Sequence, residues 1–239
     1  MASLSPWVYG GTAVVAVWLL LRRSTAWIYD VVILKMTRGW YAELIKRLPA
    51  GARVLDVGIG TGSALLCNAD AVSGKKMRWI GLDLDQAYVT ACDKALKAST
   101  FLRDCSSVAQ ADFYDANALA AIKKSLAKSS SDENFDAVYF SGSFSLLPDP
   151  AEALRIAKRL LKKGGRVYIT QTFQHKSPPL FARLKPALKY LTTIDFGRLF
   201  FAHEVAAIVR DSGLELVAME PIPGSVSNQW QTAFIVTCS

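Results

Sequence analysis

The sequence predicts an α/β protein built on a doubly wound sheet of seven strands, with an antiparallel C-terminal strand and an additional apolar helix at the N-terminus. Three observations predict this architecture. Short apolar segments alternate with segments of helical periodicity from about residue 51 onward, as expected where helices connect parallel strands. A glycine-rich loop follows the first apolar segment. The last two strand-like segments have no helix between them, which indicates an antiparallel hairpin at the sheet edge.

The N-terminal segment carries no charged residue from Met1 to Leu21, and Arg22 and Arg23 follow it directly. About 18–20 apolar residues are needed to cross a bilayer, so we expect residues 1–23 to form a membrane-anchor helix. The basic pair would hold residues 24–239 on the cytosolic side, at the endoplasmic reticulum or another organelle membrane. Two alternatives are a helix docked over a ligand pocket and a signal peptide, although a signal peptide normally carries its positive charges before the apolar run.

Residues 24–48 have apolar side chains at helical spacing and end at Pro49, which predicts an amphipathic helix that covers the sheet. The predicted strands cover residues 53–57, 77–82, 108–111, 135–140, 166–173, 214–220 and 232–237. The predicted helices cover residues 61–74, 86–102, 116–128, 150–161 and 203–212. We expect Gly164 and Gly165 to end the fourth of these helices, because glycine commonly supplies the left-handed cap.

The composition narrows the possible partners. The chain of 239 residues has a net charge of +8 at pH 7 but shows no recognisable nucleic-acid-binding module, so we expect no nucleic-acid partner. Basic clusters within residues 158–166 and 176–189 are suited to anionic lipid headgroups, although ordinary solvated helix faces would give the same pattern. The four cysteines form no Cys-x-x-Cys pair and no group has metal-ligand spacing, so we expect no metal.

The segment Leu55-Asp56-Val57-Gly58-Ile59-Gly60-Thr61-Gly62-Ser63 joins the first strand to a loop in which glycine recurs at every second position. Glycine allows a tight turn and the close approach of a ligand. The segment resembles the first motif of class I S-adenosylmethionine (SAM)-dependent methyltransferases. The competing motif, the dinucleotide fingerprint, places a pyrophosphate at this point. A carboxylate beside the loop would repel a pyrophosphate but can bind the α-ammonium group of SAM. The resemblance implies cofactor contacts from Asp56, Gly58, Gly60, Thr61 and Gly62.

Two further acidic positions follow the second and third strands. Asp83 ends the second strand, where an acid accepts the two ribose hydroxyl groups of either cofactor class, with Leu84 as a neighbouring contact and Asp85 as the cap of the next helix. Asp112 and Phe113 follow the third strand. In the methyltransferases that this chain resembles, these positions bind the adenine N6 amine and pack against the adenine ring. An Asp that caps a helix beside a Phe in the core is the structural alternative.

Residues 135–150 are similar to the fourth-strand segment of the methyltransferase family that includes the ubiquinone/menaquinone-biosynthesis and sterol-type enzymes, and residues 160–169 to its turn into the fifth strand. The chain departs from that family at Lys163, where a proline is usual, and at Leu147, where a histidine is frequent. The matches span residues 51–173 in order. They imply a Rossmann-like fold that transfers a methyl group from SAM.

The sequence indicates less about the methyl acceptor than about the cofactor. Ser141, Tyr139 and His175 are candidate catalytic residues near the ends of the fourth and fifth strands, although Tyr139 alternates within a buried strand. Residues 175–198 mix apolar and basic side chains, which suggests a lid for a small lipophilic acceptor such as a quinone, isoprenoid, sterol or lipid. The alternatives are a small thiol or a protein side chain as acceptor, an NAD-binding oxidoreductase, and a non-catalytic SAM-binding membrane module.

Overall fold

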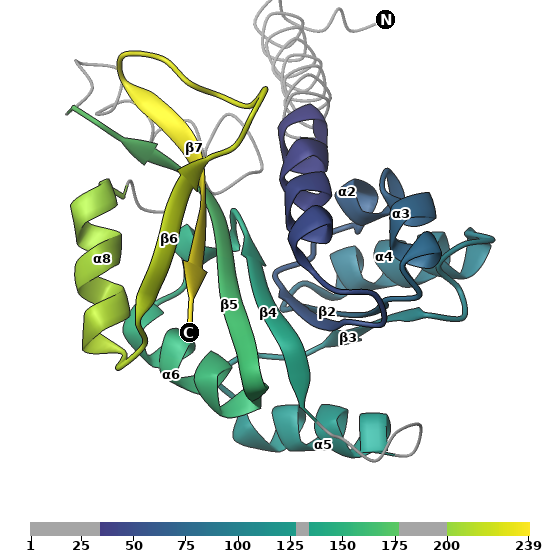
Figure 1. Ribbon diagram of the computed structural model, residues 1–239. Helices are drawn as coiled ribbons and strands as arrows, with labels where there is room; N and C mark the ends of the chain where they lie inside the picture. The colour runs from purple at the N-terminus through teal and green to yellow at the C-terminus, as the bar shows by residue number, and fades with distance from the viewer. Residues whose placement is uncertain (1–33, 128–133, 177–199) are drawn as a thin grey trace, which may run out of the picture.

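The computed structural model describes residues 34–127, 134–176 and 200–239 (Figure 1). Seven strands form one sheet in the order β3-β2-β1-β4-β5-β7-β6. The strands are β1 (Arg53–Val57), β2 (Arg78–Asp83), β3 (Ser106–Gln110), β4 (Phe135–Ser141), β5 (Leu161–Gln174), β6 (Leu216–Pro221) and β7 (Gln231–Cys238). Strands β1 to β5 pair in parallel, whereas β7 is antiparallel to both β5 and β6. The predicted doubly wound sheet with an antiparallel C-terminal strand is confirmed.

Helices cover both faces of this sheet. They are the helix over residues 34–47, α2 (Ser63–Leu66), α3 (Ala69–Gly74), α4 (Gln86–Ala98), α5 (Ala116–Ala127), α6 (Pro150–Leu160) and α8 (Ala202–Asp211). Alternate strand residues point to opposite faces, so Leu55 and Val57 pack with α5, α6 and α8, whereas Val54 and Ala137 pack with helix 34–47, α3 and α4. Figure 1 shows the two groups of helices on either side of the strands.

Three predictions about helix ends are wrong. The helix expected over residues 86–102 ends earlier, at Ala98. The helix expected over residues 61–74 is broken into α2 and α3 at Asn68, whose side-chain amide donates to the carbonyl oxygens of Ala64 and Arg38. The helix expected over residues 150–161 ends at Leu160, so Gly164 does not cap it. Gly164 instead lies in β5 with φ +80°, where the register with β4 shifts. Gly164 therefore adopts its left-handed conformation at an irregularity of the strand. The spacing of glycines in a sequence does not distinguish such an irregularity from a helix cap.

The N-terminal predictions are tested only in part. Residues 34–47 form the described part of the helix expected over residues 24–48. The membrane anchor expected over residues 1–23 lies outside the described residues, as does most of the acceptor lid expected over residues 175–198. Among the residues that the structure describes, none forms a helix both long and apolar enough to span a bilayer.

The carboxyl ends of β1 to β5 share one edge of the sheet, which we call the carboxyl edge. Gln231, the first residue of β7, pairs with Gln174 at the end of β5, so the β6–β7 turn lies at this edge too. Helix 34–47 also begins there, because the Trp40 indole N–H donates to Ser225 Oγ of that turn at 2.9 Å. In open α/β sheets ligands bind at this edge, and it holds the predicted site residues.

Candidate active site at the carboxyl edge

The glycine loop after β1 adopts the conformation that its sequence requires. Gly58, Gly60 and Gly62 have φ values of +78°, +60° and +70°, in the left-handed region that glycine favours. A Cβ atom on Gly58 would lie 2.5 Å from Ser143 Cβ, whereas a Cβ on Gly60 would meet no atom of the described residues within 4 Å. The loop is therefore packed against the protein at its first glycine and open at its second, which fits a cradle for a bound ligand.

Thr61, the other predicted contact in the loop, lies at the surface. Its hydroxyl group is 2.8 Å from Ser63 Oγ at the start of α2. This pair places two hydroxyl groups beside the open second glycine. The predicted cofactor contact of Thr61 stays a prediction.

Asp83 holds the glycine loop and the start of α4 together. Its Oδ2 accepts the Gly60 N–H at 2.8 Å, and its Oδ1 accepts the Asp85 N–H at 3.0 Å. Asp85 in turn accepts the Ala87 N–H at 2.7 Å, which confirms it as the N-cap of α4. Each Asp83 carboxylate oxygen has a further lone pair for a ribose hydroxyl. Leu84, beside Asp83, is 67% exposed, so its side chain is available to pack against a ligand.

We expect Asp83→Ala to weaken SAM binding by about a hundredfold. The change removes the proposed acceptor of two ribose hydroxyl groups, and hydrogen bonds to a charged group contribute about 1.5–3 kcal/mol each. It also frees the Gly60 N–H. Calorimetric titration measures the affinity, with Asp104→Ala as the control because Asp104 is highly exposed and lies outside the carboxyl edge. Equal affinity of the two variants would remove Asp83 from the site.

Asp56 lies in β1 and is completely buried. Its Oδ2 accepts two hydrogen bonds, from the Tyr41 hydroxyl at 2.6 Å and from the Trp79 indole N–H at 2.9 Å. Its Oδ1 has no hydrogen-bond partner among the residues that the structure describes. Burial raises the pKa of Asp56 to about 7, opposed by these two hydrogen bonds and reinforced by the charge of Asp83. A buried carboxylate oxygen without a hydrogen-bond donor costs free energy, and an ammonium group would supply the missing donor.

Tyr139 and Ser141 occupy different environments in β4. Tyr139 is fully buried, stacks edge-on against Tyr41 and Trp79, and shares a 2.8 Å hydrogen bond with Thr170. Burial raises its pKa, so the phenol stays neutral. This is the environment of a core residue, and it gives no support to a catalytic role. Ser141 ends β4 at the carboxyl edge with a buried hydroxyl group, and its predicted cofactor and acceptor contacts stay predictions.

Asp112 and Phe113 follow β3 at the same edge. Asp112 Oδ1 accepts the Tyr114 N–H at 2.9 Å and the residue is exposed, so it remains free to contact a ligand. Phe113 is buried, with its ring edge-on to Phe140 at a centroid distance of 5.6 Å. Its face is occupied by the core, which favours the structural alternative for Phe113. An adenine contact through this ring is untested.

His175 is exposed just beyond β5. Its Nε2 lies 2.8 Å from Thr232 Oγ1, and its backbone N–H donates to the Trp230 carbonyl oxygen at 2.8 Å. Two large apolar side chains at this edge are exposed, Trp230 by 39% and Leu146 by 52%. The His175 imidazole thus lies next to the exposed Trp230 at the edge where ligands bind.

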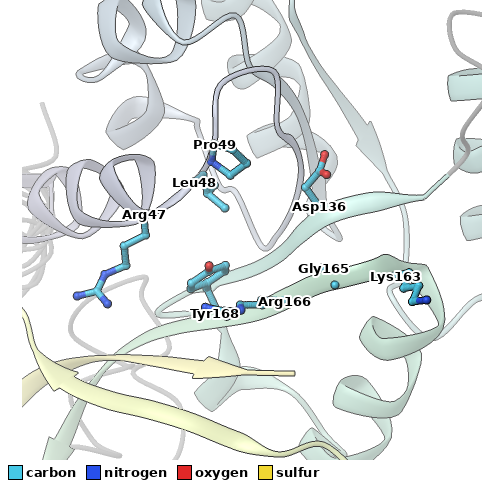
Figure 2. A pocket seen from close by; sticks show the side chains of 9 residues that line it. Arg47, Leu48, Pro49, Asp136, Lys163, Gly165, Arg166 and Tyr168 are labelled. Atoms are coloured by element: carbon cyan, nitrogen blue, oxygen red, sulfur yellow. The ribbon is translucent and has the colours of Figure 1, made fainter.

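A cavity of about 260 Å³ lies at the opposite edge of the sheet, between the end of helix 34–47 and the first residues of β4 and β5 (Figure 2). Its wall includes Arg47, Lys163 and Arg166 together with Asp136. None of the predicted site residues lines it. The cavity is therefore separate from the carboxyl edge.

Several residues of the site escaped sequence analysis. Helical periodicity places Tyr41 only within the amphipathic helix over residues 24–48, and Trp79 lies within the strand expected over residues 77–82. Ser143 lies within the fourth-strand motif over residues 135–150, which indicates no role for it, yet its hydroxyl donates to the Val57 carbonyl oxygen and its side chain packs on Gly58. The available signal was that Tyr41 and Trp79 can each place a polar group inside an apolar layer, where it needs a partner. Asp56 is that partner.

Known proteins resemble this chain in sequence and fold. A family model described as a methyltransferase domain matches residues 35–219. Ubiquinone biosynthesis O-methyltransferase of Xanthomonas axonopodis pv. citri (strain 306) is 29% identical over 191 residues, covering 77% of this chain and 70% of that protein. Phosphatidylethanolamine N-methyltransferase of Cereibacter sphaeroides is 27% identical over 177 residues, covering 74% and 77%.

The fold is similar to that of a SAM-dependent methyltransferase from Geobacter sulfurreducens in complex with S-adenosyl-L-homocysteine. The TM-score is 0.56 at 14% identity, over 84% of this chain and 90% of the other. The similar fold, the named relatives and a family model that covers most of the chain agree with the geometry of the glycine loop. The chain therefore belongs to the methyltransferase-domain family, and the protein is a SAM-dependent methyltransferase.

Proposed function

We propose that the protein transfers the methyl group of SAM to a small lipophilic acceptor, of the quinone, isoprenoid, sterol or lipid class. The observation that carries this proposal is the exposed side chain of Trp230, whose backbone carbonyl oxygen accepts the His175 N–H, together with the exposed Leu146 at the same carboxyl edge. The names of two relatives, one acting in ubiquinone biosynthesis and one on phosphatidylethanolamine, support the same acceptor class.

The residues present fit the cofactor. Asp56 Oδ1 would receive the α-ammonium group, and Asp83 would accept the ribose hydroxyl groups. The open second glycine of the loop leaves room for the methionine and ribose portions, with Thr61 beside it. Leu84 would cover one face of the adenine and Asp112 would accept its amine. When bound, SAM supplies an electrophilic methyl group on a positively charged sulfur.

The chain's own contribution to the reaction is alignment and proton removal. Holding the acceptor atom in line with the methyl group at about 3–3.5 Å supplies much of the rate enhancement. A hydroxyl acceptor must also lose its proton as the new bond to carbon forms. His175 is the group at this edge that would take the proton, and its bond to Thr232 Oγ1 orients the ring. An amine or thiol acceptor would need less help.

We further propose that residues 1–23 anchor the protein in a membrane, with the domain on the cytosolic side. Support comes from the uncharged run of 21 residues followed by Arg22 and Arg23. Helix 34–47 begins at the carboxyl edge, as the bond from Trp40 to the β6–β7 turn requires. A membrane-anchored chain would therefore enter the domain at the edge where a lipophilic acceptor is proposed to bind.

The acceptor class can be tested with radiolabelled SAM and defined probes. We expect the full-length protein to methylate a prenylated catechol or phosphatidylethanolamine in vesicles, with the product identified by mass spectrometry. Methylation of a short alkyl thiol or of a peptide side chain, with neither lipophilic probe accepted, would contradict the proposal and favour the corresponding alternative.

We expect Trp230→Ala to raise the KM for the lipophilic probe about five- to tenfold while kcat changes little. The indole would bury its remaining exposed area, 39% of its surface, against the acceptor tail. Full burial of a large apolar side chain contributes about 1.5–3 kcal/mol, so this share is roughly 1 kcal/mol. Phe101→Ala is the control, because Phe101 is also an exposed aromatic residue, at 54% against 39% for Trp230, but follows α4 at the opposite edge of the sheet. A similar rise in KM for both variants would mean that Trp230 does not contact the acceptor.

A further inference from the structure

The hydrogen bonds to Asp56 are unevenly divided between its two carboxylate oxygens. The Tyr41 hydroxyl comes from helix 34–47 and the Trp79 indole from β2, and both donate to Oδ2. Oδ1 is equally inaccessible and has no donor. The two rings stack on one another with centroids 5.7 Å apart, so each fixes the position of the other.

We propose that Tyr41 is a positioning residue for the methionine end of the cofactor. It holds Oδ2 of Asp56 so that Oδ1 faces the α-ammonium group. The inference rests on the role proposed above for Asp56. It makes helix 34–47 part of the cofactor site as well as a cover over the sheet.

The electrostatic environment agrees with this role. Within the described part of the chain, the titratable groups that interact electrostatically with Asp56 include Tyr41, Tyr139, Cys92 and Asp83. Burial raises the pKa values of both tyrosines, and that of Cys92 to about 12, so these three stay neutral and Tyr41 remains a donor. The Tyr41 hydrogen bond lowers the pKa of Asp56 against the effect of burial. Tyr41 thus favours the ionised carboxylate that an ammonium group needs.

The position of Tyr41 is secured by its neighbours on the same helix. Trp40 is bonded to Ser225, and its ring lies 3.5 Å from where a Cβ on Gly142 would be. One turn earlier, the Arg38 carbonyl oxygen accepts the Asn68 side-chain amide at 3.1 Å. These contacts fix the helix to the β6–β7 turn, the end of β4 and the break between α2 and α3.

The test compares two ligands that differ only in the α-amino group. S-adenosylhomocysteine and its analogue with hydrogen in place of that group are titrated calorimetrically into the full-length protein and into Tyr41→Phe. We expect the variant to bind S-adenosylhomocysteine about tenfold more weakly and the analogue within twofold of the original affinity. The pH at which S-adenosylhomocysteine affinity reaches half its maximum should also move upward, because Asp56 loses a bond that lowers its pKa.

Tyr168→Phe is the matched control, since Tyr168 is also buried in this layer of the core but lies in the wall of the cavity at the opposite edge. It should change neither affinity. If Tyr41→Phe does not fold, Trp79→Phe removes the other donor to Oδ2, and the same selective loss is expected.

The outcomes separate two kinds of failure. An unmodified protein that binds the two ligands equally would overturn the role of Asp56, and with it the inference. A preference for S-adenosylhomocysteine that survives Tyr41→Phe, or a variant weakened equally toward both ligands, would overturn the role of Tyr41 alone.

Discussion

Replacing Asp56 by asparagine is expected to make the ligand-free protein more stable above pH 7 and to remove most of its affinity for SAM. The two effects have one cause: in the ligand-free protein the Asp56 carboxylate is buried without the ammonium group that is proposed to pair with it. Asparagine has the same shape, and its carbonyl oxygen can still accept from Tyr41 and Trp79. It lacks the negative charge, so we expect SAM binding to fall about a hundredfold.

The sign of the stability effect follows from the pKa of Asp56. Burial raises it from 3.8 to about 7 in the folded protein. As the pH rises above about 4, the unfolded chain releases this proton first, so stability is lost progressively until about pH 7 and then stays low. A difference of about three pKa values corresponds to about 4 kcal/mol, an upper bound for a single buried group. The asparagine variant has no such loss.

Thermal unfolding of the ligand-free proteins between pH 4 and pH 8.5 measures this difference. The melting temperature of Asp56→Asn should exceed that of the original protein by several degrees at pH 8, and the gap should close toward pH 4. Asp104→Asn, at an exposed position, should follow the original protein throughout. A destabilised asparagine variant at pH 8 would mean that Asp56 is neutral or already paired in the free protein.

The core of the fold and the cofactor loop were predictable because local sequence determines them. Strands such as β4 are buried and mostly apolar, with Asp136 and Ser141 as the half-buried polar positions, as expected near the centre of a parallel sheet, and the glycine spacing after β1 permits few conformations. The break at Asn68 was not predictable in this way, because its cause is a hydrogen bond to Arg38 thirty residues earlier. The end of α6 similarly depends on how β5 pairs with β4.

The candidate site likewise combines features that local sequence predicts with contacts between distant segments that it does not predict. Asp83 and its loop contacts follow from adjacent motifs, and the structure brings them together. The bond from Tyr41 to Asp56 joins two layers of the fold, and helical periodicity assigns Tyr41 to the apolar face without indicating its partner. Tyr139 is a catalytic candidate by sequence because it lies near the end of the fourth strand, although it alternates within a buried strand. Its complete burial follows from the packing of helix 34–47 and β2 around it.

Gly58 and Gly60, the packed and the open positions of the glycine loop, should respond differently to replacement by alanine. Gly58→Ala is expected to destabilise the protein by about 3 kcal/mol or more. Its Cβ would lie 2.5 Å from Ser143 Cβ, in addition to the strain of φ +78°. Ser143 cannot move aside freely, because its hydroxyl is bonded to the Val57 carbonyl oxygen. A melting temperature lowered by roughly 6–12 °C is the expected observation.

Gly60→Ala carries a similar backbone strain, at φ +60°, but meets no protein atom. We expect a loss of about 1–2 kcal/mol, the cost of the left-handed conformation. Gly51→Ala, with φ +75° and equally open surroundings at the start of β1, is the control for that strain. The two variants should unfold alike, whereas only Gly60→Ala should weaken SAM binding, by at least about tenfold. Because the strain is matched, a lower affinity in Gly60→Ala alone measures the space that the ligand occupies. Equal affinities would place the cofactor elsewhere, even with the loop folded as described.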